Sequence, residues 1–599
     1  MPLDAVSRRI AVRAFLARSA RSAGCGLGLI ALGGAAQAAW QCTDLVVVTT
    51  EDATITSAAV VPPGPVAGAN VNADVGFCRV QGVARPSADS EIKFEVWLPE
   101  TAAAWTGRLK VNGTGGYAGA VPFTRLAQDI GDGFVTAGSN MGHDGGENAS
   151  WTLGRPEKVK DWGLRAHYSV TTAAKAVSAA LYGRPVQHAY FEGCSNGGRQ
   201  ALMMAQNYPQ LFDGIVAGAP SNFYPDLLMW LLWTGKQLTP SAPFGPPAVS
   251  EAKRQAVTAR VLAACDAQDG LADGQLTSPR ACNFDIETLG PAGDGTLSAQ
   301  ELAVFQAMYE GTTSETGERK YTGAKLGSEA DWSPLFADNG GYGNFIGHYV
   351  YGVPTFDWRN APGLFSTVYA DAKAALTPVT AAPSPDLRAF RAHGGKLIQV
   401  HGWNDSVVAP DGSIGYFHAL TQFEKIERLP TRLQDAVIDR LSPLDLAVTS
   451  LVLGDRVRQF HRLFMMPAVG HCGGSTGPSA IGGGMPEPPK ALRKPETHVV
   501  SALMKWVEQG VAPEKIIATR LDANGNILRQ RPLCPYPEQA VYIGKGSVDR
   551  ADSFACRLPL PARRSQRPDE WTGPFDVNDG DLLHARNALT QRKLLLPDR

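Results

Sequence analysis

The residues best placed to do chemistry surround Ser195, in the stretch "FEGCSNGGRQ". Gly193 and Gly197 flank this serine two positions away on either side, which matches the pattern G-x-S-x-G. Small residues at these positions permit a sharp turn from a strand into a helix and expose the hydroxyl. An apolar run precedes the motif and a helical pattern follows it, so the sequence predicts a serine nucleophile. A glycine-rich helix start with an unremarkable serine is the alternative.

A serine hydroxyl needs a histidine to accept its proton and a carboxylate to orient that histidine. On an α/β-hydrolase sheet these residues follow the serine in the order acid, then histidine, each in a loop after a later strand. "LIQVHGWNDSVV" places Asp405 directly after a strand-like run, and "FMMPAVGHCGG" places His471 after another. Asp411 and Asp455 are alternative acids that follow no clear strand, and His401 can be a structural histidine.

Two cysteines adjoin these residues, because Cys194 precedes Ser195 and Cys472 follows His471. Neighbouring Cα atoms lie about 3.8 Å apart and disulfide-linked Cα atoms about 5.5 to 6 Å apart. A bond between the two cysteines would therefore bring the serine and histidine loops side by side. The alternative is that Cys194 is itself the nucleophile, but the position within the G-x-S-x-G turn favours Ser195.

The segments around these residues alternate between strand and helix patterns. A helical spacing over residues 168–183 lies among strand-like runs at residues 91–99, 107–113, 133–140, 189–193, 213–220, 394–402 and 458–467. This alternation predicts an α/β fold with a parallel sheet. Residues 221–385 are rich in Trp, Tyr, Gly and Pro with few such runs, which predicts a lid inserted into an α/β-hydrolase core.

The two ends of the chain differ from this core. Arginines between Arg8 and Arg21 precede the apolar stretch "CGLGLIALGGAAQA", as in a secretory signal cleaved near Ala38. "SRRIAV" also resembles a twin-arginine signal, so the sequence leaves the Sec and twin-arginine routes open. The predicted division is a signal peptide over residues 1–38, core over 39–220, lid over 221–385, core over 386–560 and a tail over 561–599.

Composition limits the classes of partner. The 599 residues are 44% hydrophobic with a formal net charge of -1, which describes a globular protein with a large core. No stretch combines Lys and Arg with aromatic residues, which argues against a nucleic-acid partner. No run after the signal is apolar for the ~20 residues that a membrane span needs.

Cys25 belongs to the signal and leaves eight cysteines. An even number in an exported chain predicts four disulfides and a secreted or periplasmic location. The oligomeric state is not predicted.

Four motifs, "GCSNGGRQ", "HGWND", "GHCGG" and "RPLCPYP", resemble the tannase and feruloyl esterase family, which includes relatives of mono(hydroxyethyl) terephthalate hydrolase. The similarity runs from about Cys42 to Cys556. It implies Ser195 as nucleophile, Asp405 as orienting acid and His471 as base. It also implies the disulfides Cys194–Cys472, Cys265–Cys282, Cys42–Cys78 and Cys534–Cys556.

An oxyanion hole is expected from two backbone N–H groups, because serine attack on an ester places negative charge on the carbonyl oxygen. One donor should be Asn196, directly after the nucleophile. The other is expected from the glycine-rich turn "NGTGGYAGA", where Thr114 is the preferred residue and Gly115 the alternative.

The segment between Cys265 and Cys282, here called the acidic loop, carries three aspartates. Calcium prefers oxygen ligands from carboxylates and backbone carbonyls, whereas a solvated loop is the alternative. The resemblance implies a structural calcium ion held by Asp266, Asp269, Asp273 and the carbonyl oxygens of Leu271 and Gln275. The nearby "GPAGDGTLSAQE" lacks carboxylates at the first and third EF-hand positions, so it predicts a helix with the capping box Ser298 to Glu301.

These observations predict an exported serine esterase that hydrolyses feruloyl, galloyl or related aromatic esters through an acyl-enzyme. The substrate would be a small-molecule aromatic ester. A serine peptidase with the same triad and a non-catalytic binding module are the alternatives. Aromatic residues of the predicted lid suit a planar acyl group, although such residues more often form lid core; they are Trp230, Trp233, Tyr342, Phe345, Tyr349 and Trp358.

Overall fold

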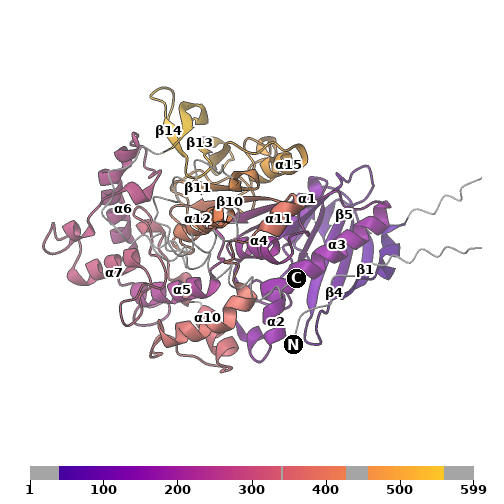
Figure 1. Cartoon of the computed structure of the whole chain (residues 1–599), viewed down its shortest axis with the longest axis horizontal. Coiled ribbons are helices and arrows are strands. Elements are labelled where there is room, and N and C mark those ends of the chain that lie inside the picture. The colour runs from indigo at the N-terminus through magenta and orange to yellow at the C-terminus, as the bar shows by residue number, and fades with distance from the viewer. Residues whose placement is uncertain (1–39, 147, 339–340, 427–455, 559–599) are drawn as a thin grey trace, which may run out of the picture. The chain divides into compact units, whose positions relative to one another are not determined.

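The computed structural model describes residues 40–146, 148–338, 341–426 and 456–558 (Figure 1). All of the described residues belong to one compact unit. Four sequence predictions lie outside them: the signal peptide, the place of Cys25 in it, the alternative acid Asp455 and the C-terminal tail.

A nine-stranded sheet forms the centre, with the order β1-β4-β5-β7-β6-β8-β9-β10-β11. The strands are β1 (Ala53–Val61), β4 (Phe77–Ala84), β5 (Ile92–Pro99), β6 (Arg108–Asn112), β7 (Val135–Ser139), β8 (His188–Cys194), β9 (Gly214–Gly218), β10 (Lys396–Gly402) and β11 (His461–Met466). Pairing is parallel from β7 through β6, β8, β9 and β10 to β11, which confirms the predicted parallel sheet. The pairs β1–β4, β4–β5 and β5–β7 are antiparallel, an edge that the sequence did not predict.

The parallel strands are buried on both faces, which explains their nearly continuous apolar sequences. Alternate residues of a strand enter different clusters: Phe191 and Ile215 belong to the largest one, whereas Tyr190 and Val216 pack with Leu503 on the other face. Because parallel strands end at the same edge, the loops after β8, β10 and β11 meet there.

Helices of the core follow the strands in sequence. They are α1 (Phe123–Gly131), α2 (Pro156–Lys160), α3 (Ala166–Tyr182), α4 (Asn196–Asn207), α11 (Arg388–His393), α12 (Pro410–Ile426) and α15 (Val499–Gln509). Helix α4 packs against β8 and β9, and α15 packs against β9 and β10. No helix in the described part of the chain is long and apolar enough to cross a membrane.

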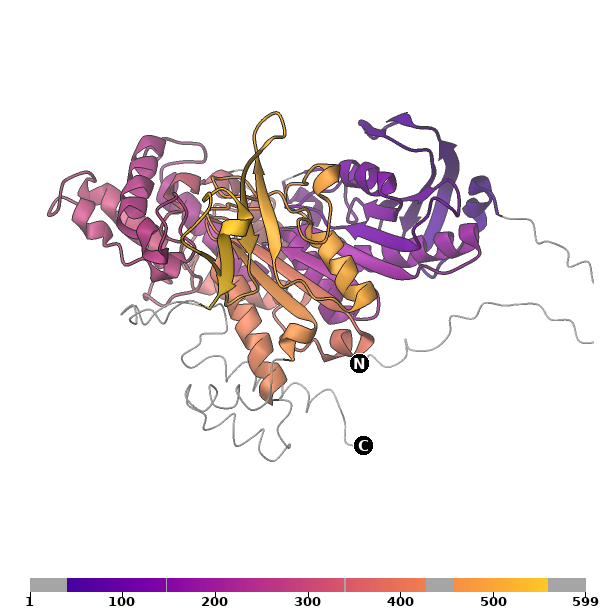
Figure 2. The same ribbon diagram turned by 90° about the horizontal axis from the view of Figure 1, so that it is seen from above.

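The segment between β9 and β10 is helical, and its described residues contain no strand. Besides α11, its helices are α5 (Tyr224–Leu238), α6 (Glu251–Cys265), α7 (Ala299–Glu310), α8 (Leu335–Asp338), α9 (Gly341–Phe345) and α10 (Thr367–Thr380). They lie on the side away from β1 and β4 (Figures 1 and 2). Helix α7 begins with the capping box of Ser298 and Glu301 that the sequence predicts.

Small two-stranded sheets complete the fold. They pair β2 (Gly64–Val66) with β3 (Val71–Ala73), β12 (Ile516–Leu521) with β13 (Ile527–Leu533), and β14 (Gln539–Tyr542) with β15 (Phe554–Arg557). The four disulfides have the pairing that the resemblance implies: Cys42–Cys78, Cys194–Cys472, Cys265–Cys282 and Cys534–Cys556.

Candidate active site

Ser195 occupies the turn between β8 and α4. Its backbone has φ 63° and ψ -121°, a region that non-glycine residues rarely adopt. The turn is tight, because a Cβ on Gly193 would lie 2.6 Å from the backbone of Gly197. The N–H of Ser195 donates to the carbonyl of Gly218 at 3.0 Å, which ties the turn to the end of β9. This is the strand-to-helix turn that the G-x-S-x-G motif predicts.

The structure brings Ser195, His471 and Asp405 together in one hydrogen-bonded chain. His471 Nε2 lies 2.9 Å from Ser195 Oγ, and His471 Nδ1 lies 2.8 Å from Asp405 Oδ2. In this geometry the Ser195 hydroxyl donates to Nε2, and Nδ1–H donates to the carboxylate. The arrangement can remove a proton from the serine while the acid stabilises the resulting imidazolium.

Asp405 is fully buried, and its carboxylate accepts several hydrogen bonds. Its Oδ1 accepts from the N–H groups of Val407 at 2.9 Å and Val408 at 2.8 Å, and His401 Nε2 lies 3.3 Å from Oδ2. Burial opposes ionisation, but the charge of His471 and the hydrogen bonds from both histidines outweigh it. They hold the pKa of Asp405 well below its ordinary value, so the carboxylate remains ionised.

His401 is more than the structural histidine that the sequence suggested. Its Nε2 lies 2.9 Å from the carbonyl of Val408, and its Nδ1 lies 2.6 Å from Ser413 Oγ. A carbonyl can only accept, so the proton resides on Nε2, the atom that also faces Asp405. Gln399 donates to Ser413 Oγ at 2.7 Å and completes the support. The sequence places His401 in the right loop but gives no signal for this contact.

Asp411, an alternative acid, is engaged elsewhere. Its buried carboxylate pairs with Arg280 and Lys325 and accepts from Thr322 Oγ1 at 2.7 Å. Burial opposes ionisation, yet these two cations hold its pKa well below the ordinary value. Asp411 therefore links α12 to the inserted segment and does not serve His471.

The Cys194–Cys472 disulfide joins the serine turn to the histidine loop. The two Cα atoms lie 5.9 Å apart, and the bond spans 278 residues of sequence. A disulfide sulfur cannot act as a thiolate, so Cys194 is excluded as the nucleophile in this state.

One of the two expected oxyanion donors is already occupied. The N–H of Thr114 donates to Gln200 Oε1 at 2.9 Å, and the same oxygen lies 2.9 Å from His167 Nε2. This hydrogen bond argues against Thr114 and favours the alternative, Gly115, where a Cβ would meet no atom within 4 Å. The other expected donor, Asn196, is the first residue of α4 and follows Ser195 directly.

A buried arginine fixes Asn196. Arg199 Nε donates to Asn196 Oδ1 at 2.7 Å, and Asn196 Nδ2 donates to the carbonyl of Thr114 at 3.2 Å. The guanidinium lies 4.4 Å from the ring of Trp162, and burial lowers the pKa of Arg199 to about 10. The serine turn and the glycine-rich turn are thereby held together. The motif "GCSNGGRQ" contains Arg199, but the sequence does not indicate which residues this arginine contacts.

A buried ion cluster joins β6 and β8, the strands that lead to the site, to helix α1. Lys110 Nζ is 2.7 Å from Asp129 Oδ1 and 3.1 Å from Glu192 Oε1, so one cation faces two carboxylates. Burial raises the pKa of Asp129 to about 6, and the charge of Glu192 adds to this, although Lys110 opposes it. Glu192 is part of β8, three residues before Ser195.

Most of the aromatic residues that the sequence singles out in the inserted segment are buried. Trp230, Tyr342, Phe345 and Trp358 are buried, which favours a role in the core for them. The rings of Tyr342 and Phe345 nevertheless lie 4.9 and 5.2 Å from Tyr117, in the turn that carries Gly115. The other two, Trp233 and Tyr349, are half-buried.

The acidic loop brings its three aspartates near one another. Burial raises the pKa of Asp266 and of Asp269, and the charge of Asp273 adds to both shifts. Their carboxylates accept backbone N–H groups, such as that of Gly274 on Asp266 at 2.7 Å and that of Leu271 on Asp269 at 3.1 Å. A divalent cation would relieve this repulsion.

Other contacts of the loop limit this fit. Asp273 pairs with Arg531, and Arg529 lies 3.8 Å from the same oxygen. In the described residues no group of three or more His, Cys, Asp or Glu is already arranged as for a metal ion. Among the described turns and loops, no backbone N–H donates to the carbonyl oxygen of Leu271 or Gln275.

Comparisons with known proteins agree with this geometry. Residues 78–557 match the profile of the family "Tannase and feruloyl esterase". The chain is 35% identical over 578 residues to an uncharacterized esterase of Xanthomonas campestris pv. campestris, a match that covers 89% of this chain and 96% of the relative. It is 30% identical over 501 residues to feruloyl esterase B of Aspergillus niger, with 82% and 88% covered. The crystal structure of feruloyl esterase B from Aspergillus oryzae superposes with a TM-score of 0.72 at 26% identity and covers 85% of this chain and 98% of that one.

Proposed function

The chain belongs to the tannase and feruloyl esterase family of carboxylic ester hydrolases, and we propose that it cleaves esters of aromatic carboxylic acids by a serine mechanism. The observation that carries this proposal is the unbroken hydrogen-bonded chain from Ser195 through His471 to Asp405. The relatives' names support the substrate class, as do the aromatic rings beside the glycine-rich turn.

In the proposed reaction Ser195 Oγ attacks the ester carbonyl while His471 Nε2 accepts the hydroxyl proton. The negative oxygen would be held by the N–H of Asn196, at the N-terminus of α4, and by the N–H of Gly115 in the glycine-rich turn after β6. The C–O bond then breaks, and His471 gives its proton to the leaving alcohol. Water, deprotonated by His471, then attacks the acyl carbon. The bond from that carbon to Ser195 Oγ breaks, His471 returns the proton to Oγ, and the carboxylic acid departs. Asp405 stays ionised throughout and stabilises the imidazolium.

The test is hydrolysis of methyl ferulate, methyl gallate, chlorogenate and mono(2-hydroxyethyl) terephthalate by the purified protein and by Ser195→Ala. We expect turnover of at least one ester by the wild type, with loss of about 10⁵ to 10⁶ in rate for the variant. Cleavage of matched amides alone would support the peptidase alternative. No covalent labelling by a fluorophosphonate would support a non-catalytic module.

We also propose that the acidic loop holds a structural calcium ion through Asp266, Asp269 and Asp273 and the carbonyl oxygens of Leu271 and Gln275. The desolvated, mutually repelling carboxylates support this ligand set. A bound ion would neutralise the loop and stiffen it. The Cys265–Cys282 bond already closes its two ends.

Export of the chain to a secreted or periplasmic location is a further part of the proposal. Four disulfides support it, because such bonds persist mainly in oxidising compartments. Fractionation of cells that produce the full chain, followed by sequencing of the mature N-terminus, tests both the location and the predicted cleavage near Ala38.

A further inference from the structure

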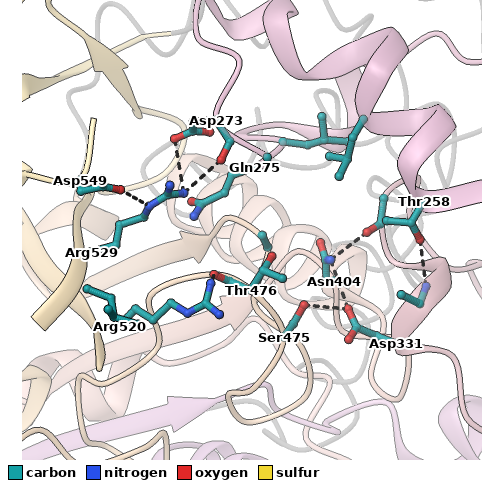
Figure 3. A pocket seen from close by; sticks show the side chains of 17 residues that line it. Thr258, Asp273, Gln275, Asp331, Asn404, Ser475, Thr476, Arg520, Arg529 and Asp549 are labelled. Carbon is teal, nitrogen blue, oxygen red and sulfur yellow. Dashed lines mark hydrogen bonds and ion pairs between the residues drawn. The ribbon is translucent and has the colours of Figure 1, made fainter. Parts of the chain in front are cut away.

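A cavity of about 440 Å³ lies beside the loops that carry the acid and the base, yet its walls include neither Asp405 nor His471 nor Ser195 (Figure 3). Its walls come from α6, the acidic loop, residues 327–331 of the inserted segment, the loops after β10 and β11, the β12–β13 hairpin and the segment of Asp549. The volume is in the range typical of small-molecule sites, which is about 300 to 1,000 Å³.

Asp331 joins the two catalytic loops at one side of this cavity. Its Oδ2 accepts from Asn404 Nδ2 at 3.2 Å and from Ser475 Oγ at 2.9 Å. Asn404 directly precedes the acid Asp405, and Ser475 follows His471 by four residues. In the part of the chain that the structure describes, Asp331 has no cationic partner. Its carboxylate therefore keeps the capacity to accept hydrogen bonds from a ligand.

Gln275 lies on another wall, beside Arg529 (Figure 3). Its side chain is 3% exposed, and neither Oε1 nor Nε2 has a hydrogen-bond partner among the described residues. A buried polar group without a partner costs about 1 to 3 kcal/mol. A ligand that offers both a donor and an acceptor to this amide would remove that cost.

The three carboxylates that line the cavity are balanced by Arg520 and Arg529 of its lining together with Arg531, which is not part of the wall. Arg529 Nε donates to Asp549 Oδ1 at 2.6 Å, and Asp273 is paired with Arg531. Arg520, which has no carboxylate partner among the described residues, offsets the charge of Asp331. An anionic ligand would meet three carboxylates, and a cationic one would meet the guanidinium groups. The lining therefore favours a neutral ligand that both donates and accepts.

We propose that this cavity binds a neutral polyhydroxylated ligand, a sugar or short oligosaccharide. Hydroxyl groups can donate to Asp331, accept from Arg520 and do both with Gln275. The apolar face of a sugar ring can pack on the leucines that also line the cavity, Leu262, Leu276 and Leu528. Because Asn404 and Ser475 belong to the catalytic loops, a bound sugar would contact both loops away from the reacting atoms.

The experiment measures binding of xylobiose, cellobiose, maltose and lactose to the full chain by calorimetry and by ligand-observed NMR. The variants are Gln275→Leu and Arg520→Met, with Gln306→Leu, in a separate cavity, as the matched control. We expect at least one disaccharide to bind with a dissociation constant of about 10 mM or below. Both cavity variants should weaken it about tenfold, and the control should not. Equal affinity in all four proteins, or no binding to the wild type, would overturn the proposal.

The sugar could be a free ligand or the alcohol part of the ester substrate, and kinetics distinguishes these sources. If it is part of the substrate, Arg520→Met should raise KM for a feruloyl disaccharide several-fold and leave KM for methyl ferulate unchanged. If it is a free ligand, saturating disaccharide should change kcat/KM for methyl ferulate in the wild type only. The binding measurement needs no turnover, so failure of the proposed esterase function would leave it interpretable.

Discussion

Loss of the Cys194–Cys472 disulfide in the Cys194→Ala, Cys472→Ala double variant should reduce catalysis more than folding. The bond closes a loop of 278 residues, for which the chain-entropy model gives about 5 to 6 kcal/mol. This is an upper figure, because measured stabilisation correlates weakly with loop length. The nine-stranded sheet and three other disulfides remain, so we expect the variant to fold with a lowered Tm.

Catalysis depends on how closely His471 is held to Ser195. The disulfide joins the residues next to each of them, with Cα atoms 5.9 Å apart. Without it, the His471 loop is linked to the serine turn through hydrogen bonds, and a displacement of about 1 Å can cost about a hundredfold in rate. We therefore expect kcat for an aromatic methyl ester to fall about tenfold or more.

The assay is kcat together with a thermal melt, and the matched control is Cys534→Ala, Cys556→Ala. That bond closes only 22 residues, so the chain-entropy model gives its removal a cost of about 3 kcal/mol. The control should melt earlier and retain wild-type kcat. A folded Cys194→Ala, Cys472→Ala protein with wild-type kcat would refute the positioning argument.

Three further predictions test other parts of the molecule. Asp405→Asn should lower kcat about 10⁴-fold, whereas Asp411→Asn should spare kcat per folded molecule. Both variants should lower Tm at neutral pH, because each removes a buried carboxylate whose pKa the fold holds below its ordinary value. A large loss of kcat in Asp411→Asn alone would exchange their roles. Removal of calcium by EDTA should lower Tm, and added calcium should restore it. If calcium added to protein verified to be metal-free left the melting curve unchanged, that result would count against the site. Asp129→Asn leaves Lys110 paired with Glu192. The raised pKa of Asp129 makes its contribution to wild-type stability fully present below pH 3.8 and lost as pH rises through about 6. The asparagine side chain of the variant does not titrate, so the Tm of Asp129→Asn relative to wild type should increase over this pH range. A Tm difference that stays constant with pH would contradict the raised pKa.

The strands and the order of the triad could be predicted because their signals are local. Runs such as residues 214–218 are apolar along their whole length, as buried parallel strands are. Ser195, Asp405 and His471 each follow such a run, and parallel strands end at one edge of the sheet. Chain order and local pattern therefore sufficed to identify the three residues that the structure brings together.

Contacts between distant segments could not be predicted in this way. The N–H of Thr114 is occupied by Gln200, which lies 86 residues away, so no local pattern distinguishes it from Gly115. The antiparallel pairing of β4 with β5 and β1 likewise depends on partners chosen by tertiary packing. The sequence offered Trp230 as a pocket residue, although such residues more often form lid core, and it could not show that the buried ring donates to the carbonyl of Ser406 at 3.0 Å, beside the acid.

The most direct test of the account is to trap the acyl-enzyme and locate it. A rapid acid quench of the wild-type protein with an aromatic ester, followed by proteolysis and mass spectrometry, identifies the residue that carries the acyl group. The account predicts an added mass equal to the acyl group on Ser195, within the peptide that spans residues 191–209, and none in Ser195→Ala. An acyl group on any other residue, or undiminished ester turnover by Ser195→Ala, would contradict it.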